Sequence, residues 1–360
     1  MRTIVKVHSP EERLSMRLMG ERRTVQCMIR LVAVTSILRT LMTGVVPLAG
    51  SASWWMALVC LLPGLAVYGL YLLSMRLTRT GVLTDMLRVA FGPYGAWLLA
   101  LLLAALLLFD GISSMTALIT LFTEGIGTEG TQFTLALLTG AVLAFSLHKD
   151  GVARGAFFLR WIMLGALAVM ALDWLGMARV DGLFPMLGSG MPSLMAALRA
   201  GVSLAWPLVL LLTAEPVRPG VRMQPVLPVA LLCVGVVLLT CLSIPHELLM
   251  THHNLAGSML EMTLHLHPAV RNLAICLLLL VFFLCIGGTA HLFTGVLAAP
   301  MGKDPAWLPY AFIAVLVLTQ LMDIRELWQM LRQCEAWLLA PLAILAALAL
   351  PMAGVRRRRA

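Results

Sequence analysis

Two charged residues stand in the middle of long apolar stretches, and they are the strongest chemical signal in the chain. Arg39 lies within the apolar stretch 26–48, and Asp110 lies within the stretch 94–122. A bare charge in hydrocarbon is costly, so such residues face a partner, a cavity or a ligand. Asp110 could pair with Arg39, hold a proton or a cation, or contact a ligand amine, while Arg39 could attract a carboxylate. A purely structural ion pair between the two is the competing interpretation.

Hydroxyl groups, a glycine and a proline follow Arg39 along the chain. They are Thr40, Thr43, Gly44 and Pro47. Hydroxyl groups close to a glycine can bond to backbone groups that a helix releases where it unwinds. We therefore expect a discontinuous helix here, in which the freed backbone around Thr43 and Gly44 coordinates a ligand. A structural ion pair or an arginine that reaches the membrane surface would explain the same residues without a ligand.

Other apolar stretches carry further candidate ligand-binding residues. Pro207 removes a helix hydrogen bond, so the stretch 194–214 is also predicted to be broken, with a simple proline kink as the alternative. Broken helices at corresponding positions of two halves point to a binding site near the membrane midplane. The additional candidates are Ser113 and Ser114 after Asp110, Ser203 and Trp206 before Pro207, and Gly288.

Signatures of enzymes and metal sites fail on inspection. Residues 125–130 match GxGxxG literally, but no predicted strand precedes them. The pair His246-Glu247 lacks the second histidine of a metalloprotease motif, and the seven cysteines form no CxxC pair. We therefore predict no enzyme, no cofactor and no metal. Solvated side chains are the simpler interpretation of the loop histidines, which are His246, His252, His253, His265 and His267.

Composition identifies the elements that must position these residues as membrane helices. Hydrophobic residues make up 61% of the chain and charged residues 12%, whereas a soluble domain carries about 25% charged residues. A helix needs about 20 apolar residues to cross the hydrocarbon core. The sequence thus predicts an all-α integral membrane protein with ten transmembrane helices, at about 26–48, 54–74, 94–122, 131–148, 156–176, 194–214, 226–246, 270–298, 306–322 and 336–354.

Two of these stretches are longer than one crossing requires. Gly92-Pro93 is expected to separate a short cytoplasmic helix, about 82–91, from the third span. The eighth span is expected to be either tilted or broken at Gly287-Gly288. No segment between the spans is long enough to form a separate soluble domain.

Basic residues gather on alternate loops, which predicts the orientation of the chain. Of the 26 Lys and Arg residues, 19 fall on one side, five on the other, and Arg30 and Arg39 lie inside the first span. Short loops rich in Lys and Arg stay in the cytoplasm. Both termini are therefore predicted to be cytoplasmic, as tails 1–25 and 356–360. The net charge of +9 is attributed to topology and to anionic lipid headgroups, and not to nucleic acid.

The ten predicted helices divide into two halves of five, 26–176 and 182–355. Because each half has an odd number of crossings, the halves must insert with opposite orientations. A five-plus-five inverted repeat of this kind, with discontinuous helices 1 and 6, is typical of transporters. The two halves show no visible sequence repeat, so this expectation rests on topology.

Three segments carry a resemblance to a known family. They are TGVVP at 43–47, HKDGVAR at 148–154 and DGLFPMLGSG at 181–190. In order and spacing they resemble the spore germination permease family, the B-subunits of spore germinant receptors within the amino acid–polyamine–organocation superfamily. The resemblance covers about 24–355.

The resemblance implies a five-plus-five inverted-repeat fold and a central pocket for an amino acid or a similar nutrient. It also implies an A-like membrane subunit and a C-like lipoprotein subunit as partners, in the spore inner membrane. The expected function is a germinant receptor subunit that binds the nutrient and signals or transports it. A proton- or sodium-coupled amino acid transporter and a scaffold subunit that binds no small molecule are the alternatives.

Overall fold

The computed structural model describes residues 10–80, 83–126, 132–147, 151–212, 226–244, 268–301, 305–321, 338, 341–349 and 351–352. Within these residues the regular structure is helical, with no β-strand. The principal helices are α1 (Pro10–Thr40), α2 (Val46–Ala49), α3 (Ser53–Thr78), α4 (Leu83–Thr120), α5 (Gln132–Leu147), α6 (Gly151–Met177), α7 (Met191–Gly201), α8 (Ala205–Leu210), α9 (Val226–Ser243), α12 (Pro268–Met301) and α13 (Leu308–Thr319). Shorter helical segments are η1 (Leu41–Val45), η2 (Gly50–Ala52), η3 (Leu121–Ile126), η4 (Val180–Leu183) and η5 (Val202–Leu204).

Several helices have the length and composition of membrane spans. Among the described residues five runs are long and apolar enough to cross a bilayer, or six if the bent pair Phe133–Ser146 and Gly151–Ile162 is one span. Large apolar side chains point outward, as Phe145 (79% exposed) and Leu172 (69% exposed) do. Soluble proteins rarely expose apolar surface on this scale, so the fold fits a multi-pass membrane protein. The five runs are Thr24–Thr78, Asp85–Thr123, Met191–Leu210, Val226–Ser243 and Val270–Ala298.

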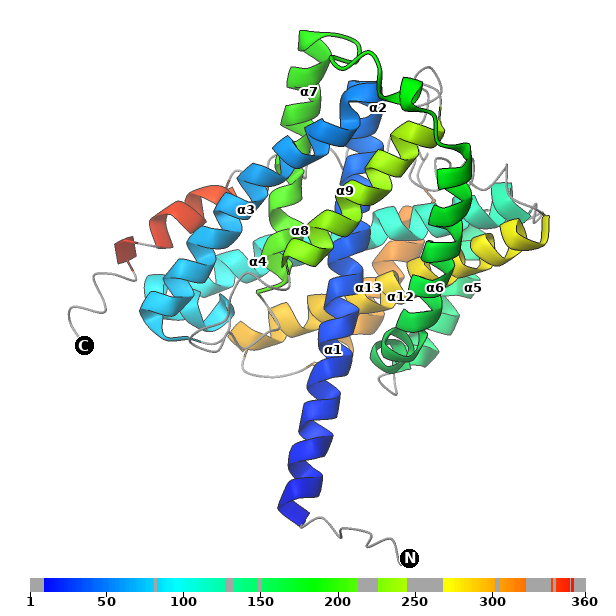
Figure 1. The fold of residues 1–360 in the computed structure, drawn as a ribbon. Coiled ribbons are helices and arrows are strands. Elements are labelled where there is room, and N and C mark those ends of the chain that lie inside the picture. Colours follow the sequence, from blue (N-terminus) through cyan, green and yellow to red (C-terminus); the bar gives the residue numbers. More distant parts are fainter. Residues whose placement is uncertain are drawn as a thin grey trace, which may run out of the picture.

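The first apolar run contains a change of direction. At Gly50 the backbone adopts a φ of 54°, a left-handed value that glycine tolerates, between α2 and α3. Figure 1 shows α1 rising to α2 and α3 descending from it at an angle. The single run Thr24–Thr78 therefore accommodates the two stretches, 26–48 and 54–74, that the sequence predicts as separate helices.

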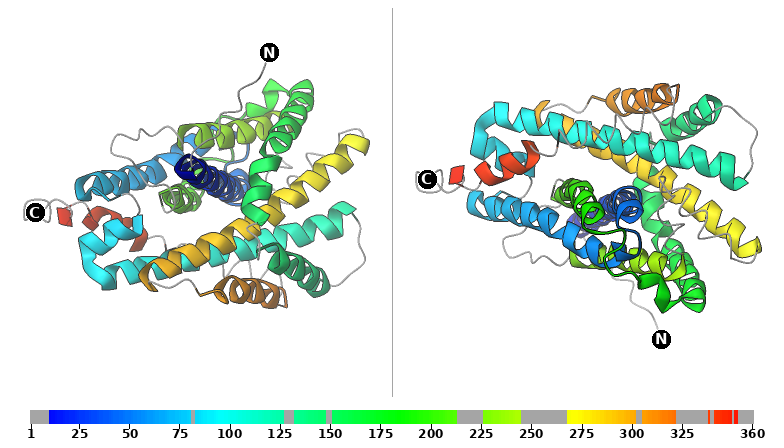
Figure 2. Two further views of the ribbon diagram at one scale, coloured as in Figure 1. Left: turned by 90° about the horizontal axis from the view of Figure 1, so that it is seen from below. Right: turned by 90° about the horizontal axis from the view of Figure 1, so that it is seen from above.

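Two helix orientations organise the molecule. The helix α1 and the α7–η5–α8 segment run side by side in opposite directions (Figure 1), and α1 contacts both η5 and α8. The long helices α4 and α12 pack along each other and lie across the direction of α1, which Figure 2 shows end-on. This crossing brings the C-terminal end of α1, with Ser36 and Arg39, against the last third of α4, with Asp110 and Ser113.

The long helices answer two sequence expectations. In α4, Gly92 has non-helical angles (φ 78°, ψ −174°), which confirms the predicted separation of a short helix from the third span. In α12, the helix continues through Gly287-Gly288 from Pro268 to Met301. The eighth span is therefore not broken at these glycines. The missing side chain of Gly287 instead lets the side chain of Val152 approach α12 closely.

Close helix packing at Gly64 of α3 yields a testable prediction. A Cβ atom at Gly64 would lie 3.1 Å from the Leu204 carbonyl oxygen and 3.2 Å from Ala205 Cα, whereas nothing lies within 4 Å at Gly69 of the same helix. We expect Gly64→Ala to lower the free energy of unfolding by about 1–3 kcal/mol, because backbone atoms cannot move aside cheaply. The matched change Gly69→Ala should raise it by up to about 1 kcal/mol. Unfolding in mixed micelles measures both, and equal effects would contradict the packing.

Candidate functional site

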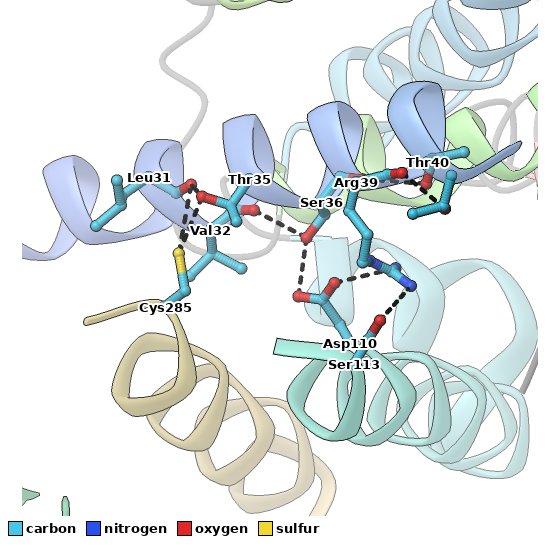
Figure 3. Close-up of polar contacts among 10 residues, drawn as sticks. Leu31, Val32, Thr35, Ser36, Arg39, Thr40, Asp110, Ser113 and Cys285 are labelled. Carbon is cyan, nitrogen blue, oxygen red and sulfur yellow. Dashed lines mark hydrogen bonds and ion pairs between the residues drawn. The ribbon is translucent and has the colours of Figure 1, made fainter. Parts of the chain in front are cut away.

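Arg39 and Asp110 form a buried ion pair where α1 crosses α4. Arg39 Nη2 lies 3.0 Å from Asp110 Oδ1, and the two side chains are only 9% and 3% exposed. Figure 3 shows the two side chains pointing toward each other between the helices. Each charge compensates the other, so the burial of both is possible without leaving an isolated ion in an apolar interior.

Two serine hydroxyls extend the ion pair. Arg39 Nη1 donates to Ser113 Oγ at 3.1 Å, and Ser36 Oγ donates to Asp110 Oδ2 at 2.8 Å (Figure 3). Ser113 is a predicted site residue, whereas Ser36 is not. The spacing of three residues between Ser36 and Arg39 places both on one face of a helix, and this was the signal that could have identified Ser36. The predicted candidate Ser114 is also buried on α4.

Threonine hydroxyls close to the ion pair bond to backbone carbonyls of α1. Thr40 Oγ1 donates to the Ser36 carbonyl at 3.0 Å, and Thr43 Oγ1 donates to the Arg39 carbonyl at 2.8 Å. The sequence predicts such bonds where a helix unwinds, but here they form on a segment that changes from α- to π-helical winding and stays helical.

The break expected after Arg39 takes the form of a π-helical turn. Residues Leu41–Val45 form η1, and the Val46 N–H bonds to the Leu41 carbonyl five residues earlier. The turn is almost wholly buried, so its backbone groups need partners, and a π-turn provides them where an unwound segment would not. Single π-turns inside α-helices are frequent at functional sites.

The break expected in the sixth stretch is a 3-10 turn. Residues Val202–Leu204 form η5, and Ser203 Oγ donates to the Ala200 carbonyl at 2.7 Å. Trp206 follows as a fully buried side chain. The η1 turn contacts α7, where a Cβ on Gly44 would lie 3.3 Å from Ala200 Cβ. The two irregular turns thus lie on neighbouring antiparallel segments.

Gly288 lies in a different environment from the other candidates. A Cβ at Gly288 would lie 2.7 Å from Val32 Cγ2 and 3.1 Å from Met28 Cγ. The glycine therefore allows α12 to approach α1 closely beside Met28 and Val32, which precede Ser36 in the chain. The neighbouring Cys285 Sγ lies 3.0 Å from Thr35 Oγ1, which joins the same two helices (Figure 3).

A second buried polar contact lies farther along α4. Thr116 Oγ1 and the Gln320 side chain approach to 3.3–3.4 Å, and both residues are buried. Together with Asp110 and Ser113, Thr116 continues a polar face of α4 toward the η3 turn. Neither Thr116 nor Gln320 is a predicted site residue, because a separation of 204 residues in the chain leaves no local signal of the pairing.

The site contains charges and hydroxyl groups but no cluster typical of a metal site. In the described part of the chain no group of three or more His, Cys, Asp or Glu side chains could hold a metal ion. The histidines at 246, 252, 253, 265 and 267 lie outside the described residues. What the cluster can do is bind charge of both signs: the guanidinium can receive a carboxylate, and the carboxylate can receive an ammonium group.

Comparison with models of known protein families and with curated proteins finds no match for this chain. The geometry therefore carries the functional conclusion without a relative to support it.

Proposed function

We propose that the chain is a membrane protein of the transporter-like inverted-repeat fold that binds a small zwitterion, such as an amino acid, at the Arg39–Asp110 cluster. In this proposal ten helices cross the membrane and both termini are cytoplasmic. The antiparallel placement of the η1 and η5 turns supports a relation between the first and sixth helices. The observation that carries the proposal is the buried ion pair beside the π-turn.

A zwitterion is the ligand class that matches the electrostatics of this cluster. The pair Arg39–Asp110 is neutral as a unit and almost fully buried. An amino acid can exchange that one ion pair for two, its carboxylate on Arg39 and its ammonium group on Asp110, and the site stays neutral throughout. A ligand with a net charge would bring an uncompensated charge into a low-dielectric interior, which is strongly unfavourable.

The exchange also supplies a conformational signal. While Arg39 binds Asp110, it ties α1 to α4 just before the η1 turn. When the ligand occupies both charges, α1 and α4 are joined through the ligand, and α1 can shift against α4 within the first half. Such a shift would serve a germinant receptor subunit that signals to A-like and C-like partners in the spore inner membrane. It would serve equally in a proton- or sodium-coupled amino acid transporter.

One observation favours a scaffold role instead. Arg39 and Asp110 already satisfy each other, with Ser113 and Ser36 as additional partners. A pair of this kind can exist solely to fix α1 against α4, in a subunit that holds partners and binds no small molecule.

Binding measurements on the full chain in lipid nanodiscs distinguish these functions. We expect zwitterionic amino acids to bind more tightly than the matched amine or carboxylic acid that lacks one of the two charges. Uptake of the bound amino acid into proteoliposomes would identify a transporter, and binding without uptake would favour the receptor. If no amino acid of a full panel binds, the result would favour the scaffold role, in which the chain binds no small molecule.

A further inference from the structure

A second concentration of positive charge lies where α1 packs against α6. The Arg160 guanidinium carbon lies 4.1 Å from the ring centroid of Phe157 and 5.1 Å from that of Trp161. Its Nε atom is buried and has no hydrogen-bond partner in the described part of the chain. The charge of Arg160 is thus met by aromatic rings, and its hydrogen-bonding capacity is incompletely used.

Arg30 of α1 lies near the same point. Cys27 Sγ of α1 lies 3.5 Å from the Ala156 carbonyl of α6. Arg30 follows Cys27 by three residues and Arg160 follows Ala156 by four, so each arginine lies on the same face of its helix as this contact. Two guanidinium groups from two helices therefore flank one contact between those helices. Arg30 is exposed and precedes Arg39 by nine residues, about 13 Å along the helix axis, so this charge is separate from the Arg39–Asp110 cluster.

Apolar surface adjoins the two arginines. Trp161, whose ring contacts Arg160, is 68% exposed, and Leu164, one helical turn beyond Arg160 on the same face of α6, is 47% exposed. Beneath them α1, α6 and α12 are joined by buried apolar side chains, namely Met28, Val152, Ala153, Ala156 and Leu284. The surface thus combines a dense positive charge with an apolar face that points away from the protein.

We propose that this surface, formed by Arg30, Arg160, Trp161 and Leu164, binds one phospholipid with a net negative headgroup. The lipid phosphate lies between the two guanidinium groups, which bind phosphate oxygens in pairs. One acyl chain follows Leu164, and Trp161 lies at the boundary between headgroup and chain. The exposed apolar face selects a lipid over a soluble phosphate, because a free headgroup would leave that face uncovered.

Native mass spectrometry of the full chain tests this site. The protein is reconstituted in nanodiscs with equal phosphatidylglycerol and phosphatidylcholine, released into detergent, and its retained lipid is identified. We expect phosphatidylglycerol to be retained in preference to phosphatidylcholine. The double variant Arg30→Gln/Arg160→Gln should reduce that preference about 25-fold, since each arginine near anionic lipid contributes a factor of about five.

Matched controls keep the outcome interpretable. Arg199→Gln removes an exposed arginine from α7 and should leave lipid retention unchanged. If the double variant does not fold, the single variants Arg30→Gln and Arg160→Gln replace it, and each should reduce the lipid preference about fivefold. Glycerophosphoglycerol, the headgroup without acyl chains, should not raise the unfolding temperature. Equal retention of the two lipids by the unsubstituted protein, undiminished retention by the Arg30 and Arg160 variants, or stabilisation by the free headgroup would each overturn the proposal.

Discussion

Replacing Asp110 with alanine should lower the free energy of unfolding by about 3–5 kcal/mol, because the substitution leaves a buried guanidinium without its counter-charge. Arg39 is 7% exposed and lies against Asp110 and Ser113 of α4, so its guanidinium has little access to water. Reversible unfolding of the full chain in mixed micelles measures the change. Replacement of Arg39 with methionine should be similarly costly, since it leaves the Asp110 carboxylate buried and alone.

Two controls separate the charge from the loss of side-chain volume. Ser114→Ala truncates another buried residue of α4 and should cost no more than about 1–2 kcal/mol, a typical value for one hydrogen-bonding group. The double variant Arg39→Met/Asp110→Leu replaces both charges with apolar groups and should recover most of the stability lost by either single change. If the double variant is as unstable as the sum of the single variants, the ion pair is not the source of the cost.

The pairing of Arg39 with Asp110 was within reach of the sequence because charged residues are rare in apolar stretches. The first stretch carries Arg39 and the third carries Asp110 near its middle, and burial of one charge favours the presence of the other. Hydropathy also located the helices: each of the ten predicted stretches coincides with helical residues in the described part of the chain. The short α5 and α13, at 16 and 12 residues, fall below the length that marks an independent crossing.

Backbone geometry at the expected breaks was beyond the sequence. Gly44 with Pro47 and Ser203 with Pro207 predicted interruptions, and irregular turns occur at both places, but not as unwound segments. Burial by other helices denies such a turn water as a partner, so the turn must supply its own backbone bonds, as the Val46 N–H and the Leu41 carbonyl do in η1. The packing role of Gly288 also depends on another helix, because the residues that it allows to approach, Met28 and Val32, belong to α1.

Exchanging the two charges, with Arg39→Asp and Asp110→Arg in one chain, should keep the fold and weaken the binding of a zwitterionic amino acid by about 100-fold, or about 2.7 kcal/mol. The exchanged pair remains neutral and buried between α1 and α4. Ser36 and Ser113 can serve either charge, because a hydroxyl both donates and accepts. The ligand, however, must reverse its carboxylate and ammonium positions, which moves its side chain relative to the η1 turn.

The exchanged variant separates the proposed binding role from the scaffold role. Its unfolding free energy in mixed micelles serves as the control for folding, and calorimetry in nanodiscs measures the binding of the amino acid. A scaffold requires only that α1 and α4 remain tied, so the variant should then restore all functions that Asp110→Ala removes. If the exchanged variant folds and binds amino acids as tightly as the original chain, the carboxylate and ammonium assignments to Arg39 and Asp110 are wrong. If it folds with about 100-fold weaker binding, the orientation of the pair matters, as ligand recognition requires and helix tethering does not.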